Sequence, residues 1–129
     1  MTVPQNCGVV QVAQHADDLD RATEFYTQTL GLRLIARFGP LVFVDLGGTR
    51  LLLEEAAPVA MIYLRVADLR ERVSQLRDAG VDIVAEPHVI FTDTDGVFGP
   101  AERAEWQAFV RDSEGNLLGL VAHQDAPQS

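Results

Sequence analysis

Two side chains in the second half of the chain are suited to acid–base chemistry near neutral pH. Glu105 precedes Trp106, and a carboxylate beside apolar surface has its charged form disfavoured, which suits a general acid or base. His88 follows Pro87 in a segment rich in turn residues, and histidine ordinarily titrates near pH 7. Each also has a structural interpretation: a rim ion pair with an arginine for Glu105, and a hydrogen-bonded loop residue for His88.

Other patterns that carry chemistry are missing or have a structural explanation. The sequence holds no nucleophile elbow, no P-loop and no cluster of cysteine and histidine. The one cysteine, Cys7, cannot form a disulfide within the chain and is expected to be a small strand residue. The run DTDG at 93–96 is similar to the start of a calcium loop but lacks the later acidic ligands, so it predicts a turn. His15 is expected at the surface, and His123 near a frayed end.

Composition restricts the class of partner. The chain has 129 residues, of which 47% are hydrophobic and 22% charged, as expected for one globular domain. Its formal net charge of -9 repels phosphate backbones and anionic lipid, so neither nucleic acid nor a membrane is expected as a partner. No apolar run approaches the roughly 20 residues of a membrane span, and residues 1–8 lack a secretion signal. These features, with the single cysteine, favour a cytoplasmic protein.

The hydrophobic pattern predicts one order of elements twice. Helices are expected at 19–30 and 69–79, the first capped by Asp17 or Asp18 and the second by Asp68. Eight strands are expected from apolar or alternating runs, at 9–13, 32–38, 41–46, 50–54, 61–66, 81–85, 105–111 and 117–122.

This order indicates an internal duplication. Asp18-Leu19 and Asp68-Leu69 are equivalent and lie about 50 positions apart. Each βαβββ module can bury one face of its sheet under its helix, while the second faces curve into one shared cup. We therefore predict an α+β fold, with tandem modules forming a cupped mixed sheet and helices on the outer face. The single domain would comprise module one at about 8–58 and module two at about 59–124.

Turn residues predict how the strands connect. Gly47-Gly48 accepts the positive φ angles of a tight hairpin turn, and 112–115 forms a second turn. Residues 87–101 are rich in Gly, Pro, Asp and Thr and predict a long loop able to cover the cup, with a strand at 88–91 as an option.

Two segments carry a family resemblance. The segment 11–19 (QVAQHADDL), followed by Phe25-Tyr26 and Leu30-Gly31-Leu32, resembles the first module of the vicinal oxygen chelate superfamily. The segment 109–118 (FVRDSEGNLL) is similar to the turn that ends a module in that superfamily. The resemblance covers roughly 7–123 and implies the fold above and, because relatives commonly pair, a homodimer. It implies no single activity, since members include glyoxalase I, methylmalonyl-CoA epimerase, extradiol dioxygenases, fosfomycin-modifying enzymes and metal-free bleomycin-binding proteins.

The resemblance also implies where metal ligands would lie. In metal-using relatives, two ligands come from the first strand of each module and two, usually acidic, from the last. Carried over, these positions hold Gln11 and Met61, then Leu52 and Gly119. Hard divalent ions prefer carboxylate oxygen or imidazole nitrogen, so one amide oxygen does not make a site. We expect no metal cofactor; if an ion is present, Gln11 and Glu54 are its expected ligands.

Alternation along the strands predicts which side chains line the cup. Across the two turns, Phe43 is expected opposite Leu52, and Phe109 opposite Gly119. The residues expected to bind a ligand combine apolar or aromatic surface with two amides: Gln11, Phe43, Leu52, Met61, Tyr63, Gln107 and Phe109.

Three functional hypotheses follow. The first is a metal-independent small-molecule pocket, used for sequestration or for acid–base chemistry by Glu105 or His88. The alternative is a metal-dependent lyase, isomerase or dioxygenase of the glyoxalase type, with displaced ligands among Gln11, Glu54, His88 and Glu105. The third is a domain that serves only for dimerisation, with its pocket filled by side chains. No residue pattern identifies the substrate.

Overall fold

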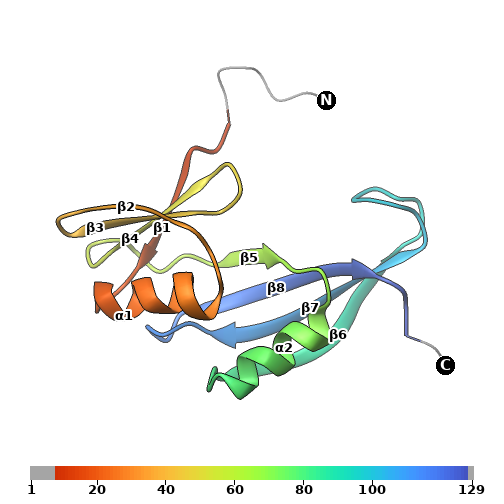
Figure 1. Ribbon diagram of the computed structural model, residues 1–129. Helices are drawn as coiled ribbons and strands as arrows, with labels where there is room; N and C mark the ends of the chain where they lie inside the picture. The colour runs from red at the N-terminus through yellow and green to blue at the C-terminus, as the bar shows by residue number, and fades with distance from the viewer. Residues whose placement is uncertain (1–7, 128–129) are drawn as a thin grey trace. The chain divides into compact units, whose positions relative to one another are not determined.

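The computed structural model describes residues 8–127, and the chain divides after Ala60 into two units. Module one precedes this point and module two follows it. Each module has the order βαβββ and a four-stranded mixed sheet, which confirms the predicted tandem modules (Figure 1). Cys7 lies outside the described residues. No helix within 8–127 is long and apolar enough to cross a membrane.

The sheet of module one has the strand order β1-β4-β3-β2. Its strands are β1 (Gln11–His15), β2 (Leu34–Phe38), β3 (Leu41–Asp45) and β4 (Arg50–Glu54). β1 pairs in parallel with β4, whereas the other pairings are antiparallel. Gly47 and Gly48 have φ angles of 81° and 105°, so the predicted turn between β3 and β4 is confirmed.

The helix of module one changes its geometry partway along. α1 (Leu19–Glu24) begins after Asp18, whose carboxylate accepts a hydrogen bond from the Arg21 backbone N–H at 3.1 Å. The predicted helix then continues as a π-helical segment, η1 (Phe25–Thr29), in which the Leu30 N–H donates to the Phe25 carbonyl at 2.9 Å. The adjacent rings of Phe25 and Tyr26 are both buried and meet edge to face. The wider turn therefore accompanies burial of two neighbouring aromatic side chains.

One face of the first sheet forms the core of module one. The residues with no exposed surface on its central strands are Val42, Val44, Leu51 and Leu53. Gln14 is equally buried, and its amide donates to the Ala60 carbonyl at 2.8 Å and accepts from the Ala60 N–H at 2.9 Å. This paired bond satisfies a buried polar side chain and fixes the end of module one against β1.

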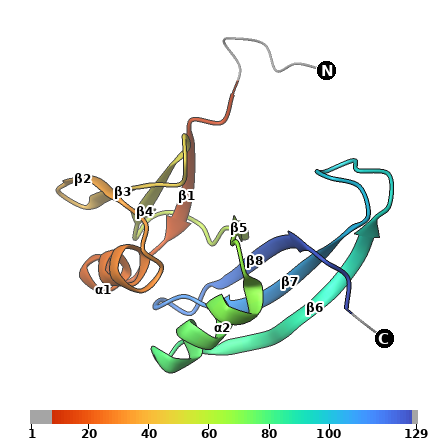
Figure 2. The same cartoon turned by 45° about the vertical axis from the view of Figure 1, so that its right-hand side comes forward.

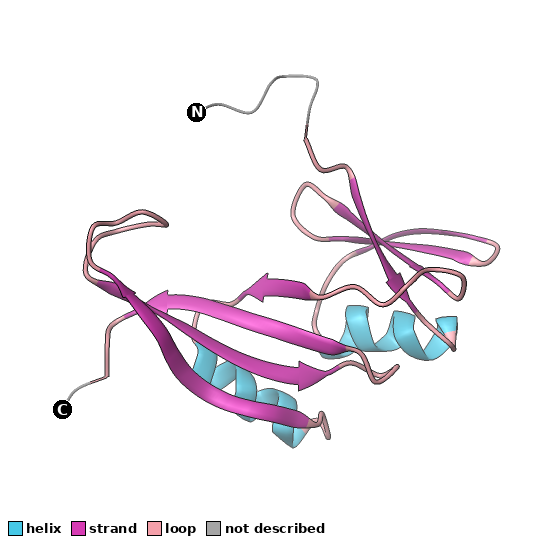
Figure 3. Ribbon diagram, turned by 180° about the vertical axis from the view of Figure 1, so that it is seen from behind, coloured by secondary structure: helices cyan, strands magenta, loops and turns pink. Residues whose placement is uncertain are grey.

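The sheet of module two has the order β5-β8-β7-β6. Its strands are β5 (Ile62–Arg65), β6 (Ile83–Asp93), β7 (Arg103–Arg111) and β8 (Leu117–Gln124). α2 (Leu69–Asp78) lies along one face of this sheet (Figures 2 and 3). Asp68 caps α2 as predicted, accepting from the Glu71 N–H at 3.2 Å. The side chains of Ala104, Trp106, Ala108 and Val110 fill the helix side of β7.

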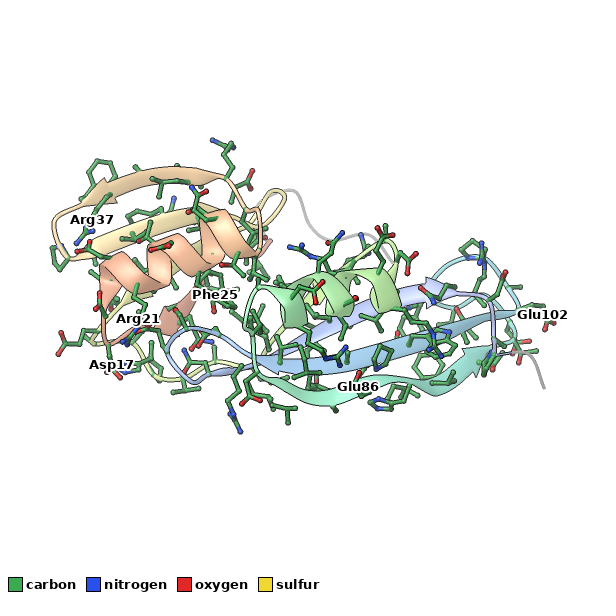
Figure 4. All side chains as sticks on the ribbon, turned by 60° about the horizontal axis from the view of Figure 1, so that its bottom comes forward. Asp17, Arg21, Phe25, Arg37, Glu86 and Glu102 are labelled. Atoms are coloured by element: carbon green, nitrogen blue, oxygen red, sulfur yellow. The ribbon has the colours of Figure 1, made fainter. Side chains whose placement is uncertain are left out.

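The segment 87–101 is not one long loop, because β6 runs on to Asp93; the optional strand predicted at 88–91 is confirmed as part of β6. β6 is an edge strand, and its pairing with β7 shifts register between Ala85 and His88, around Pro87. Proline lacks an N–H and is tolerated at such an irregularity of an edge strand, so it does not end the strand. The loop itself comprises residues 94–102, between β6 and β7. The Asp93 carboxylate holds its first turn by accepting hydrogen bonds from the Val97 and Phe98 N–H groups, at 2.8 and 2.9 Å. The last residue of the loop, Glu102, has a φ of 69° and lies at the far end of this hairpin (Figure 4).

Candidate functional site

The predicted pairing of the second hairpin is confirmed. Phe109 lies opposite Gly119, and the same register places Glu105 opposite His123. Residues paired in this way share a face of the sheet, and this face is the one that α2 does not cover. The first hairpin also has the predicted pairing, with Phe43 opposite Leu52.

Three rings form an aromatic row on the open face of the second sheet: Tyr63, Phe109 and His88. The Tyr63 and Phe109 rings meet edge to face with centroids 6.1 Å apart, and the His88 ring lies 6.4 Å from that of Phe109. Gly119 makes this arrangement possible, because a Cβ there would lie 2.4 Å from a Tyr63 ring carbon. Tyr63 lies over the backbone of β8 and remains 54% exposed. The row therefore presents an accessible aromatic surface.

A carboxylate network lies beside the row and consists of Glu105, Gln107 and His123. One Glu105 oxygen is 2.8 Å from the His123 Nε2, and the other accepts from the Gln107 amide at 2.8 Å. The Glu105 side chain is only 15% exposed. An ionised carboxylate can only accept, so Nε2 of His123 carries a proton and donates it in this bond.

His123 is the network member that sequence reasoning missed. It was expected near a frayed end, which is wrong because β8 extends to Gln124 and includes it. The signal was present in the sequence, since a register that pairs Phe109 with Gly119 also pairs Glu105 with His123. Glu105 is thus joined to a histidine rather than to an arginine.

His88 lies in β6, opposite Gln107, rather than in a loop. Its Nδ1 is 2.8 Å from the Glu86 carbonyl. A carbonyl only accepts, so Nδ1 donates and the exposed ring keeps the Nε2 lone pair. Glu86, labelled in Figure 4, forms an ion pair with Arg77 of α2 that ties this edge strand to the helix.

A depression of about 230 Å³ lies where β5 and β8 end. Its lining residues are Arg65, Val66, Ala67, Val121 and His123. Arg65 follows Tyr63 by two residues on the same strand, so the depression adjoins the aromatic row.

Asp93 is a further acidic group close to His123. Hydrogen bonds from the Phe98 and Val97 N–H groups lower the pKa of the Asp93 carboxyl, and nearby His123 lowers it further. Burial acts in the opposite direction but does not prevail. Asp93 is therefore an anion that stays ionised beside the network.

The open face of module one has a different polar arrangement. The Gln11 amide oxygen accepts from Arg50 Nε at 2.7 Å, and the Arg50 guanidinium lies over the Phe43 ring at 5.4 Å. Phe38 meets Phe43 edge to face, and Leu52 beside them is 8% exposed. Two of the predicted ligand residues of this module, Gln11 and Phe43, are therefore linked to each other through Arg50.

His15 ends β1 and is held on both sides of its ring. Its Nε2 is 2.7 Å from Asp17, and its Nδ1 is 2.8 Å from the Glu55 carbonyl. The Asp17 hydrogen bond is the main reason that the pKa of His15 is raised, with burial opposing it and the Glu55 carbonyl adding to it. These contacts fix the chain after β1.

The positions that would hold a metal ion by resemblance do not fit one. Gln11 lies opposite Arg50 while Glu54 lies opposite His15, so the two are four residues, or about 13 Å, apart along the paired strands. The Gln11 oxygen also faces a guanidinium, which repels a cation. Within residues 8–127, no three side chains of His, Cys, Asp or Glu are grouped so that they could hold a metal ion.

These features define a class of protein: tandem βαβββ modules with an aromatic and polar sheet face. The family model of the Glyoxalase/Bleomycin resistance protein/Dioxygenase superfamily matches residues 8–120. The chain belongs to this superfamily, which confirms the resemblance drawn from its motifs. No curated protein matches the chain.

Solved structures agree on the fold. TioX from Micromonospora sp. ML1 is 23% identical, with coverage of 91% of this chain and 99% of that one and a TM-score of 0.67. Lactoylglutathione lyase from Agrobacterium tumefaciens is 19% identical, with coverage of 92% and 96% and a TM-score of 0.69. An integron cassette protein of V. cholerae is 19% identical, and the match covers 94% of this chain and 98% of that one with a TM-score of 0.71. At these identities the likeness concerns fold alone.

Proposed function

We propose that the protein binds an organic small molecule on the open face of the second sheet, without a metal ion at the superfamily's usual positions. The observation that carries this proposal is the aromatic row beside the carboxylate network. Accessible aromatic surface with a few convergent polar groups is the typical make-up of a ligand site. Tyr63 is 54% exposed, and Gly119 lets its ring lie over the sheet, so it contributes accessible ring surface to the row.

The metal-independent form of the proposal rests on the donor set. The carried-over positions supply one amide oxygen already bonded to Arg50, and the alternative pair of Gln11 and Glu54 lies at opposite ends of the sheet. Purified protein should therefore contain no stoichiometric zinc, iron, nickel or manganese, as measured by elemental analysis. A tightly held ion that is lost in Gln11→Ala would contradict the proposal.

If the site is catalytic, His88 and Glu105 have different roles. His88 has an Nε2 lone pair beside Phe109, so it can accept a proton from a ligand on the row. Both Glu105 oxygens are engaged by His123 and Gln107, so Glu105 acts as a positioning residue. His88→Asn is then expected to abolish turnover and also to weaken binding, because it removes one ring of the aromatic row, whereas Glu105→Gln should reduce both affinity and turnover.

Binding is tested with indole, a neutral planar aromatic probe, followed by the amide chemical shifts of the intact chain. We expect saturable shifts around Tyr63, Phe109 and Gly119. Tyr63→Ala should weaken indole binding about tenfold, since loss of an aromatic contact costs about 1 kcal/mol or more. Phe98→Ala is the matched control, because Phe98 is a comparably exposed ring, at 66%, in the β6–β7 loop. Equal affinity in the wild type and Tyr63→Ala would contradict the site.

We further propose a cytoplasmic homodimer that binds neither nucleic acid nor membrane. The family resemblance supports pairing, and the net charge of -9 opposes polyanionic partners. Light scattering at high protein concentration should give twice the chain mass, and a monomeric mass would refute the dimer.

A further inference from the structure

We infer that the depression where β5 and β8 end binds the carboxylate of an aromatic acid whose ring lies on the aromatic row. The inference rests on the proposed function and names the class of ligand. A volume of about 230 Å³ is below the range typical of whole drug-sized ligands, so this depression suits the terminal group of a molecule.

Arg65 supplies the positive charge. Within residues 8–127, Arg65 has no hydrogen bond, ion pair or ring contact. Every other arginine in this range has at least one such contact. The chain carries 19 acidic residues, yet Arg65 stays unpaired in the lining of a depression. An exposed guanidinium there can receive a carboxylate in a charge-assisted, bidentate contact.

His123 lines the same depression, and its ring lies among charged groups. The charged groups near its ring are Glu105 from β7, Asp93 from the end of β6 and Arg65 from β5. Its Nε2 is engaged by Glu105, whereas its Nδ1 has no hydrogen bond within 8–127. The positive charge that receives the carboxylate is therefore that of Arg65.

The spacing of the two subsites sets the shape of the ligand. Tyr63 and Arg65 are two residues apart on one face of β5, which is about 7 Å along the strand. Gly119 and Val121 repeat this spacing on the paired strand β8. A ring over Tyr63 and Gly119 thus needs a short aliphatic linker to place its carboxylate beside Arg65 and His123.

The test compares 3-phenylpropanoate with its neutral analogue 3-phenylpropan-1-ol, by amide chemical shift titration of the intact chain. At about pH 6 we expect the acid to bind about tenfold more tightly than the alcohol. Arg65→Gln should remove this difference, while Arg72→Gln, the same change of charge on α2 of the same module, should leave it intact.

The outcomes separate the two proposals. If acid and alcohol bind equally and Arg65→Gln changes neither, the carboxylate site is overturned and the aromatic site stands. If neither compound binds the folded wild-type protein, both proposals are overturned. If the chemical shift changes caused by the acid do not saturate and are identical in Arg65→Gln and Arg72→Gln, the acid interacts only through non-specific electrostatic attraction. The carboxylate site is then also overturned.

Discussion

The two modules share one order of elements but fill the same place on their open faces in opposite ways. In module one, Ala13 of the first strand pairs with Leu52 of the last strand. In module two, the equivalent pair is Tyr63 with Gly119. The larger side chain of the pair is thus on the last strand in module one and on the first strand in module two. Because Gly119 has no side chain, the Tyr63 ring lies across β8 rather than beside a neighbour, and this creates the aromatic row.

The arginines of the two faces differ in the same sense. Arg50 in module one bonds to Gln11 and covers the Phe43 ring, so its charge is engaged within the protein. Arg65 in module two has no such contact among the described residues and lines a depression. One face is therefore satisfied internally, whereas the other keeps an aromatic surface and a charge for a ligand.

Gly119→Leu should produce the largest effect on this comparison. The new Cβ would overlap the Tyr63 ring, and we expect the free energy of unfolding to fall by about 3 kcal/mol, as in other overpacked sites. Adding Tyr63→Ala converts the pair to the arrangement of module one and should restore most of that loss. Urea unfolding of the two single variants and the double variant measures the coupling. If the effects of the two substitutions on stability are additive, the side chains at positions 63 and 119 do not compete for the same space.

Gln14→Leu should have a smaller effect, confined to module one. It leaves the N–H and carbonyl of Ala60 without their buried partner, which costs about 2 kcal/mol in the free energy of unfolding. The control is Gln75→Leu on the exposed side of α2, which should change stability by less than about 0.5 kcal/mol. A Gln14 variant as stable as the wild type would show that the clamp on Ala60 contributes nothing.

The smallest effect concerns pH and the two turn carboxylates, Asp45 in module one and Asp93 in module two. Backbone N–H groups lower the pKa of both, those of Gly47 and Gly48 for Asp45 and those of Phe98 and Val97 for Asp93. A lowered pKa in the folded state contributes stability that is present above the ordinary aspartate value of about 3.9 and is lost as pH falls through the folded value.

Asp93→Asn should therefore flatten the loss of stability below about pH 4. Asp45→Asn should do so less, because the Asp45 side chain is 30% exposed whereas Asp93 is buried. Urea midpoints measured across the acid range check both variants. Identical acid profiles for the wild type and Asp93→Asn would contradict the assignment.

Local patterns predicted the elements well where a physical rule acts over a few residues. Asp18 and Asp68 cap their helices, and Gly47-Gly48 forms the turn that fixes Phe43 opposite Leu52. Prediction failed where pairing overrode local propensity. Pro87 marks a loop in isolation, but β7 provides a long partner that keeps β6 extended through the irregularity to Asp93.

The sequence by itself determined the duplicated βαβββ order, the superfamily and the absence of metal-binding side chains at the expected positions, because these depend on residue type and spacing along the chain. Only the tertiary structure decided how the candidate residues act. Glu105 is engaged by His123 and Gln107, and Arg65 is left without a partner, because strand pairing brings together residues that are distant in sequence. A hydrogen bond depends on the direction and distance of two side chains, and the chain's order of residues specifies these only after the sheet has formed.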